Sequence, residues 1–208
     1  MIQTKDLRFA YPNGPIFNFP DITLAKDEDL LILGPSGIGK TTLLHLLGLL
    51  LAPLGGNIAH DSTDLISLSE KEKDLYRGQN IGIIFQKPRF INSLNLIENI
   101  KAKLFFAKEK VADEAIEQVL EELQIIELKH KNVQKLSEGQ KQRLSIAIAI
   151  INKPILILAD EPTANLDDHN CEKVIQLLKE TARKAQANLV LITHDQRVKP
   201  MFDKTLEL

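Results

Sequence analysis

The sequence has a single cysteine, Cys171, and no long apolar run. One cysteine excludes an internal disulfide framework and a cysteine-rich metal site. The longest apolar stretch, residues 43–54, is interrupted by His45, Gly48 and Pro53, and it is too short for a membrane-spanning helix of about 20 residues. The polar, charged first residues do not resemble a signal peptide. These absences predict a cytoplasmic protein that does not itself insert into a membrane.

The chain also lacks an excess of charge of either sign. Its 26 lysines and arginines oppose 28 aspartates and glutamates, which gives a formal net charge of −2. Binding to a nucleic-acid backbone normally requires a broad positive field, so we expect no nucleic-acid partner. The length of 208 residues and the 44% content of hydrophobic residues are those of an ordinary globular chain with a sizeable core.

Short apolar runs occupy residues 30–33, 81–85, 155–159 and 189–192. None of them alternates with polar residues, which is typical of strands in a parallel sheet covered by helices on both faces. Helical patterns separate the runs, at residues 41–51, 111–123 and 141–152 and from a cap at Asp168 to about Ala185. Strands that alternate with helices predict an α/β fold.

The N-terminal and middle parts of the chain depart from this alternation. Residues 2–9, 16–19 and 22–25 are short, strand-like and broken by prolines and glycine, which predicts antiparallel hairpins. Residues 86–136 have an almost entirely helical pattern. We therefore expect one domain over residues 1–208, in which a core holds a helical insertion at about 87–152.

Residues 34–41 read Gly-Pro-Ser-Gly-Ile-Gly-Lys-Thr and fit the phosphate-loop pattern G-x-x-x-x-G-K-[ST]. The glycines let the backbone curl so that several N–H groups point at phosphate oxygens, and the following helix adds its positive end. Lys40 would reach the β- and γ-phosphates, and the Thr41 hydroxyl would ligate Mg²⁺. The alternative is a glycine-rich turn with an exposed lysine. The position between an apolar strand and a helix favours the phosphate loop.

Two adjacent acids, Asp160 and Glu161, directly follow the apolar run 155–159. Carboxylates at the end of a buried strand are costly unless they meet a positive or polar partner. Successive strand residues point to opposite sides, so we expect the two carboxylates to have different roles. Asp160 would support Mg²⁺, mostly through a water, and Glu161 would polarise an attacking water. The alternative, two solvated acids, is disfavoured by the presence of the phosphate loop.

A third element, Leu136-Ser137-Glu138-Gly139-Gln140, opens a long helical pattern. A serine and a glycine at a helix start offer a hydroxyl and free N–H groups to an anion. Spacing alone favours the simpler interpretation, in which Ser137 caps the helix.

Taken in order, these motifs resemble an ATP-binding-cassette ATPase, the nucleotide-binding subunit of ABC transporters, over nearly the whole chain. The resemblance implies an α/β P-loop NTPase core with a mostly parallel sheet, an N-terminal antiparallel β subdomain and a helical subdomain. The matching residues are the adenine-stacking aromatic Tyr11; the Walker A loop Gly34, Pro35, Ser36, Gly37, Ile38, Gly39, Lys40, Thr41 and Thr42; the Q-loop glutamine Gln86; the signature residues Ser137, Gly139 and Gln140; the Walker B residue Asp160 with the catalytic glutamate Glu161; the D-loop Asn165, Leu166 and Asp167; and the switch histidine His194.

The resemblance implies a mechanism that one copy of the chain does not complete. In this family two copies pack head to tail, each signature closes over the γ-phosphate of the ATP held by the other copy, and hydrolysis releases them. Thr41, Gln86 and Asp160 are implied as the Mg²⁺ site, and Glu161, His194 and Gln86 as catalytic residues. The implied partner is a transmembrane permease subunit, which would hold this cytoplasmic protein peripherally at the inner face of the cell membrane.

The sequence departs from the family pattern at Glu138, which replaces the first of two signature glycines. A carboxylate aimed at the γ-phosphate would repel it, although the helix start partly offsets the charge, so we expect Glu138 to point outward. Residues 144–150 lack the arginine usual in the family, and we expect no regulatory domain after residue 208. Residues 86–100 and 158–167 are similar to the lipoprotein-releasing and macrolide-export branch, which transmits force to periplasmic machinery.

Three other functions fit parts of the sequence. A soluble ABC ATPase that acts on DNA or ribosomes usually carries long coiled-coil insertions or two cassettes, and neither fits here. A nucleotide-gated scaffold with little turnover is disfavoured by Glu161 and His194 but left open by Glu138. A P-loop kinase would leave the signature and Glu161 without a role.

Overall fold

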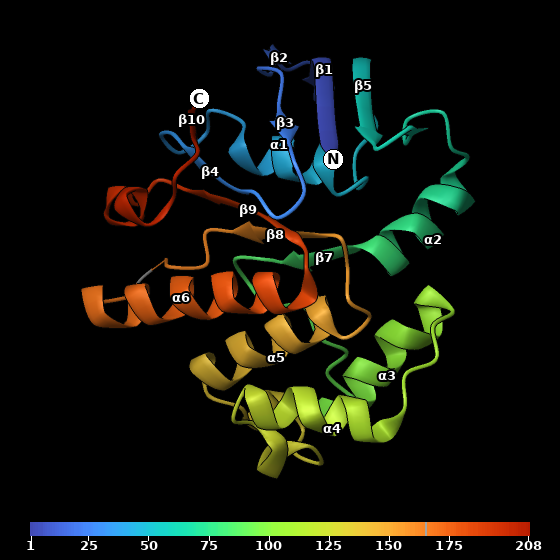
Figure 1. The fold of residues 1–208 in the computed structure, drawn as a ribbon, viewed down its shortest axis with the longest axis vertical. Helices are drawn as coiled ribbons and strands as arrows, with labels where there is room; N and C mark the ends of the chain where they lie inside the picture. Colours follow the sequence, from blue (N-terminus) through green and yellow to red (C-terminus); the bar gives the residue numbers. More distant parts are fainter. Residues whose placement is uncertain (165) are drawn as a thin grey trace.

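The fold is seen in a computed structural model that describes residues 1–164 and 166–208, and it arranges two sheets and several helices in layers (Figure 1). The central sheet has the strand order β10-β4-β9-β8-β7, with every neighbouring pair parallel. Its strands are β4 (Asp29–Leu33), β7 (Ile81–Ile84), β8 (Leu156–Asp160), β9 (Asn188–Thr193) and β10 (Thr205–Glu207). The predicted apolar runs are therefore strands, and the α/β prediction is confirmed.

The central strands are apolar throughout because both faces of the sheet are covered. Along β4, Leu31 and Leu33 belong to one cluster of buried side chains, whereas Leu30 and Ile32 belong to another. Helices α5 (Glu138–Ile150) and α6 (Asp168–Ala185) contribute to the first cluster, and α1 (Lys40–Leu47) to the second. The helices accordingly lie on opposite sides of the sheet (Figure 1).

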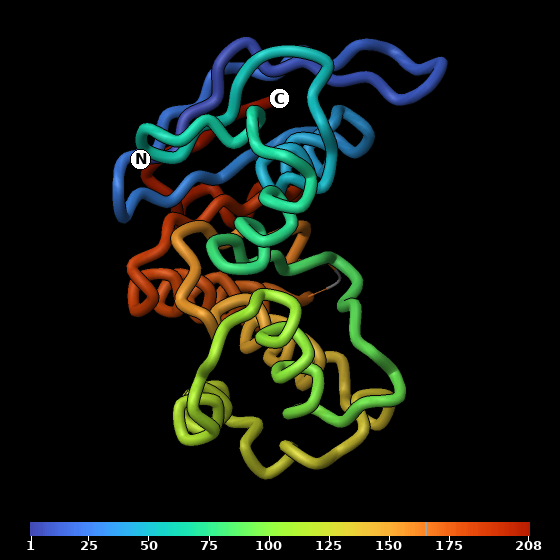
Figure 2. The backbone as a smooth tube through the Cα atoms, turned by 90° about the vertical axis from the view of Figure 1, so that its right-hand side faces the viewer, coloured from blue at the N-terminus to red at the C-terminus, as the bar shows by residue number. Residues whose placement is uncertain are grey.

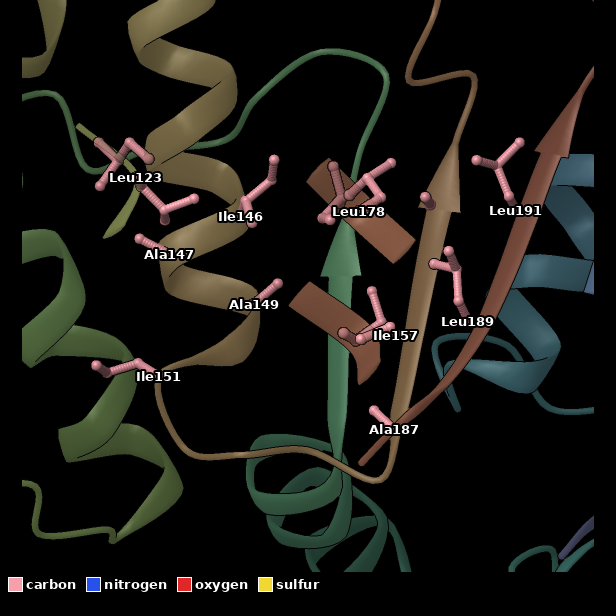
Figure 3. Packing of buried hydrophobic residues seen from close by; sticks show 14 of the residues in the cluster. Leu123, Ile146, Ala147, Ala149, Ile151, Ile157, Leu178, Ala187, Leu189 and Leu191 are labelled. Atoms are coloured by element: carbon pink, nitrogen blue, oxygen red, sulfur yellow. The ribbon is translucent and has the colours of Figure 1, made fainter. Parts of the chain in front are cut away.

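On the first face, side chains from β8 and β9 meet those of the two covering helices (Figure 3). Ile157 and Leu189 lie among Ile146 of α5 and Leu178 of α6. Helix α5 also approaches β7 closely at Gly82, where an added Cβ would lie only 2.3 Å from the carbonyl oxygen of Ala149. This close approach requires a glycine, and it ties α5 to the central sheet.

An antiparallel sheet packs over α1 on the second face (Figure 1). Its order is β2-β1-β5-β6, with β3 on β1, and its strands are β1 (Ile2–Ala10), β2 (Ile16–Asn18), β3 (Thr23–Leu24), β5 (Gly55–His60) and β6 (Thr63–Asp64). The predicted N-terminal strands and their antiparallel pairing are confirmed. Strand β5 has no recognisable pattern, because it opens with two glycines and buries only Ile58.

The remaining helices are α2 (Glu70–Asn80), α3 (Leu96–Ala107) and α4 (Asp113–Glu122), with the 3₁₀ turns η1 (Ile126–Leu128), η2 (Val133–Lys135) and η3 (Gln196–Met201). Helices α3 and α4 lie at the opposite end of the molecule from the antiparallel sheet (Figure 2). Among the residues described, no helix combines the length and apolarity needed to cross a bilayer.

Several predicted helix boundaries are wrong, for local reasons. The helix expected over residues 41–51 ends at Leu47, because Gly48 caps it and Leu49 follows in the left-handed region. The cap of α6 is Asp167, which accepts from the N–H of Asn170 at 2.9 Å, and not Asp168. Residues 86–95, expected to be helical, form bends, turns and irregular chain before α3.

Candidate active site

The carboxyl ends of four neighbouring parallel strands bring the predicted site residues together. Strand β4 leads into the glycine loop, β7 into the segment of Gln86, β8 ends at Asp160, and β9 leads into His194. Leu33 at the end of β4 pairs with Thr193 at the end of β9, so the loops that follow these strands leave the sheet on the same side, at the carboxyl ends of the strands. Ligand sites of open α/β sheets lie at the carboxyl ends of the strands.

The glycine loop between β4 and α1 has a backbone that glycine adopts without strain. Gly37 has a φ of 84° and Gly39 a φ of 108°, both in the left-handed region. Helix α1 starts directly after Gly39, and the capping position itself has no side chain that could accept a hydrogen bond from the first N–H groups of the helix. An anion placed there would meet free N–H groups and the positive end of the helix dipole.

Lys40 is buried and folded back on this loop. Its Nζ donates to the carbonyl oxygens of Gly34 at 2.8 Å and Pro35 at 3.0 Å, and it lies 3.7 Å from Oε1 of Glu161. The ammonium group is therefore surrounded by oxygen atoms at the point where loop and strand ends meet.

Asp160 faces α1. Its Oδ1 accepts a hydrogen bond from the hydroxyl of Thr41 at 3.2 Å, and only 6% of the residue is exposed. Burial raises the pKa of Asp160, the bond from Thr41 acts in the opposite direction, and the negative charge of Glu161 adds to the rise. A buried carboxylate in this state gains from a nearby cation.

Glu161 follows the end of β8, and most of its partners differ from those of Asp160. Its Oε2 accepts from the hydroxyl of Thr193 at 2.8 Å, and its Oε1 lies 2.9 Å from Nδ1 of His194. Its φ of 47° lies in the left-handed region, which costs a non-glycine residue about 1–2 kcal/mol. Such strained residues concentrate at functional sites.

These side chains border a cavity of about 320 Å³. Of the predicted residues, Tyr11, Ser36, Gly37, Gly39, Lys40, Thr41, Thr42, Gln86, Glu161 and His194 line it, whereas Gly34, Pro35 and Ile38 belong to the same loop outside the lining, and Asp160 reaches the site through Thr41.

Tyr11 stands at the edge of the cavity, and 45% of it is exposed. Its hydroxyl forms a hydrogen bond with Oγ1 of Thr42 at 3.2 Å, and its ring meets Phe9 and Phe17 edge to face. An exposed ring beside a polar cavity can stack on a planar ligand.

Sequence reasoning missed two residues of this site. Phe17 lines the cavity and packs on the loop, where a Cβ added at Gly39 would lie 2.9 Å from it. Thr193 is fully buried and holds Glu161. The available signal for Thr193 was its position as the first polar residue after an apolar run, directly before His194.

The signature residues lie outside this cavity. Ser137 caps α5, since its hydroxyl accepts from the N–H of Gln140 at 3.4 Å while Oε1 of Gln140 accepts from the N–H of Ser137 at 3.1 Å. The cap predicted from spacing is thus confirmed. The side chain of Glu138 is 83% exposed and pairs with Lys141 at 2.8 Å.

A larger cavity of about 1020 Å³ connects these regions. Glu138 and Gly139 contribute to its lining from α5, and Gln86 and Glu161 contribute from the strand ends. Gln86 and Glu161 therefore border both cavities.

Of the predicted D-loop, Asn165 lies outside the described residues, Leu166 accepts a hydrogen bond from Arg197 through its carbonyl oxygen, and Asp167 caps α6. Arg197 also holds the pKa of Asp195 at about 2.

Within residues 1–164 and 166–208, no group of three or more histidine, cysteine, aspartate or glutamate side chains could hold a metal by itself.

Known proteins resemble this chain in both sequence and structure. The family model described as ABC transporter matches residues 17–164. The chain is 36% identical to the lipoprotein-releasing system ATP-binding protein LolD of Anaeromyxobacter dehalogenans, over 100% of this chain and 90% of the relative. It is 38% identical to LolD of Legionella pneumophila strain Lens, over 90% and 84% of the two chains.

Solved structures agree with this relationship. A dimeric structure of the bacterial ABC transporter cassette MJ0796 superposes with a TM-score of 0.88 at 30% identity, over 100% of this chain and 94% of that one. Its dimeric post-hydrolysis state bound to ADP and Pi matches equally well, with a TM-score of 0.88. The chain therefore belongs to the ABC transporter family, as one of its ATP-binding and ATP-hydrolysing cassettes.

Proposed function

We propose that two copies of this chain close head to tail around ATP and Mg²⁺ and that hydrolysis drives movement in a transmembrane partner subunit. The observation that carries the proposal is the separation of two half-sites. Lys40 and Glu161 line the nucleotide cavity, whereas Ser137 and Gly139 lie outside it. A second copy would supply its own α5 start to the γ-phosphate. The dimeric solved cassettes support this arrangement.

ATP would bind along the glycine loop. The residues from Gly34 to Thr42 would cradle the phosphates through their N–H groups and the start of α1. The Nζ of Lys40 now donates to the carbonyl oxygens of Gly34 and Pro35 at 2.8 and 3.0 Å. When ATP binds, it would donate instead to the β- and γ-phosphate oxygens. The adenine would stack on Tyr11, whose hydroxyl is held by Thr42.

The oxygen atoms beside the cavity fit Mg²⁺. The hydroxyl of Thr41, the carboxylate of Asp160 and the side-chain oxygen of Gln86 are hard ligands, and Mg²⁺ in such sites takes few protein ligands together with substrate phosphates. Burial raises the pKa of Asp160, and a bound cation would lower it again by stabilising the charged carboxylate. When bound, Mg²⁺ neutralises charge on the β- and γ-phosphates.

Glu161 would polarise the attacking water. The water oxygen bonds to the γ-phosphorus, the bond from that phosphorus to the β–γ bridging oxygen breaks, and ADP and phosphate leave. Thr193 and His194 already hold the Glu161 carboxylate by contacts of 2.8 and 2.9 Å, so little reorganisation is needed. His194 would also hold the γ-phosphate and the water, together with Ser137, Gly139 and Gln140 of the second copy.

We further infer how the chain is organised around this reaction. It forms one domain over residues 1–208 whose helical subdomain, at about 87–152, contacts the membrane subunit. Gln86 stands where the central sheet leads into that subdomain and borders both cavities, so it is suited to sense the γ-phosphate and pass the movement on. The membrane subunit would hold the chain at the cytoplasmic face, and no nucleic-acid partner is expected.

The decisive variant is Glu161→Gln, which keeps the shape of the side chain but removes its charge. We expect ATP turnover to fall to background and a stable dimer to appear on gel filtration with ATP and Mg²⁺. The matched control is Glu207→Gln, because Glu207 is an exposed carboxylate paired with Lys199. A Glu161→Gln protein that stays monomeric at saturating ATP contradicts the head-to-tail mechanism. Co-purification of nucleic acid in place of a multi-spanning membrane protein contradicts the transport role.

A further inference from the structure

Arg197 connects two segments beside the active site that lie far apart in the sequence, residues 166–168 and residues 193–197. It lies on η3, three residues after His194, and its Nε and Nη2 donate to the two carboxylate oxygens of Asp195 at 2.9 and 2.8 Å. Nη2 also donates to the carbonyl oxygen of Leu166 at 3.2 Å, and Nη1 donates to Asp168. The planar guanidinium can serve these acceptors at once, which the single ammonium group of lysine cannot.

Asp195 connects this fork to Glu161. The carboxylate of Asp195 accepts from the hydroxyl of Thr163 at 3.3 Å and from Sγ of Cys171 at 3.7 Å. Its backbone N–H donates to Oγ1 of Thr193 at 3.0 Å, and that hydroxyl donates to Glu161 at 2.8 Å. Hydrogen bonds, joined through the backbone and side chain of Asp195, thus connect Glu161 to the start of α6.

We propose that Arg197 is a positioning residue for ATP hydrolysis, which clamps residues 166–168 onto the turn formed by residues 193–197. The clamp keeps Glu161, His194 and the start of α6 in one arrangement. The inference rests on the proposed roles of Glu161 and His194. Restricting a loop removes competing conformations, and a small displacement of a catalytic group lowers its rate steeply.

The two ion pairs of the clamp differ in their exposure to solvent. The side chain of Asp168 is 91% exposed, so its pair with Arg197 is expected to contribute little to folding stability. The side chain of Asp195 is only 14% exposed, so its pair with Arg197 also stabilises the fold. Removing the fork is therefore expected to lower stability as well as turnover, and the split between kcat and KM, together with hydrogen exchange, distinguishes positioning from folding.

The test compares Arg197→Gln with Lys199→Gln in the full chain. Lys199 lies on the same 3₁₀ turn, carries the same charge and pairs with Glu207 at 2.6 Å. For Arg197→Gln we expect kcat to fall on the order of tenfold, with KM for ATP changed less than about twofold. The protein is expected to stay folded, with a melting temperature lowered by less than about 8 °C, because Asp195 loses its paired guanidinium. Lys199→Gln is expected to match the wild-type protein in all three.

A third variant distinguishes the geometry of the fork from its charge. Arg197→Lys keeps the positive charge but lacks the planar array of donors. We expect its kcat to be reduced nearly as much as that of Arg197→Gln. A lysine variant with wild-type kcat would overturn the clamp in favour of a purely electrostatic effect.

Hydrogen exchange of the nucleotide-free chain tests the clamp without reference to turnover. The N–H groups of Asn170 and Cys171 donate to the side chain and the carbonyl oxygen of Asp167. In Arg197→Gln we expect these amides to exchange faster on the order of tenfold, because the start of α6 opens more often. Unchanged exchange means that no clamp exists.

The remaining outcomes also decide the matter. Faster exchange with unchanged kcat would show that the clamp holds the loop but does not position the catalytic groups, which overturns the proposal. Turnover that survives Glu161→Gln would instead refute the proposed function, whatever Arg197→Gln does. The two ideas can therefore fail separately.

Discussion

Replacing Thr193 with valine removes the hydroxyl that links Glu161 to the turn after β9. This hydroxyl donates to Oε2 of Glu161 at 2.8 Å and accepts from the N–H of Asp195 at 3.0 Å, and the residue is fully buried. Valine has nearly the same shape, so the packing of β9 is kept while both polar neighbours lose a partner.

The magnitude follows from the two lost contacts. A hydrogen bond to a charged group contributes about 1.5–3 kcal/mol, and a buried N–H left without a partner costs about 1–3 kcal/mol. Glu161 keeps its contact with His194, which recovers part of this loss. We expect the free energy of unfolding to fall by about 2–3 kcal/mol and kcat to fall by about 10- to 100-fold. KM for ATP is expected to change little, because Thr193 lies outside the cavity lining.

Steady-state ATP turnover and urea unfolding measure these two effects. The control is Thr193→Ser, which keeps the hydroxyl and loses one methyl group at a cost of about 1 kcal/mol, with kcat within about threefold of wild type. A valine variant with wild-type kcat would refute the claim that this hydroxyl sets the position of Glu161. A serine variant as slow as the valine variant would refute it too, because the methyl group would then be responsible.

Three further predictions concern other parts of the chain. Glu138→Gly is expected to change ATPase activity by less than about tenfold, since the Glu138 side chain is exposed and its charge is paired with Lys141; a larger gain would show that the native signature is impaired. Gly82→Ala is expected to destabilise the chain to urea by about 1–3 kcal/mol, because the added Cβ would lie 2.3 Å from the carbonyl oxygen of Ala149. Burial lowers the pKa of Lys103 from 10.5 to about 8. As the pH rises, the folded state therefore loses this proton before the unfolded state does, and the free energy of unfolding rises by up to about 3 kcal/mol between pH 8 and pH 10.5. Lys103→Met is accordingly expected to raise the free energy of unfolding at pH 7 and to lose that gain near pH 10; a gain equal at both pH values would contradict the assigned charge penalty.

Features that depend on neighbours along the chain were predictable from the sequence. The left-handed backbone of Gly37 and Gly39 follows from the glycine pattern of the phosphate loop. The cap at Ser137 follows from a serine and a glutamine at the spacing of a capping box. The apolar runs identified the parallel strands, because a sheet covered on both faces requires apolar residues at every position.

Tertiary structure decided which of these local features come into contact. The spacing of residues along the sequence does not indicate which distant residues will be neighbours in space. Thr41 contacts Asp160 across 119 positions of the chain, because β8 and β9 place their carboxyl ends beside the glycine loop. The roles of Thr193 and Arg197 have no motif, since a hydroxyl or a guanidinium becomes useful only when pairing of distant strands brings acceptors within about 3 Å. Periodicity records which side of a strand or helix is buried, whereas the partners of a buried polar group depend on how the whole chain packs.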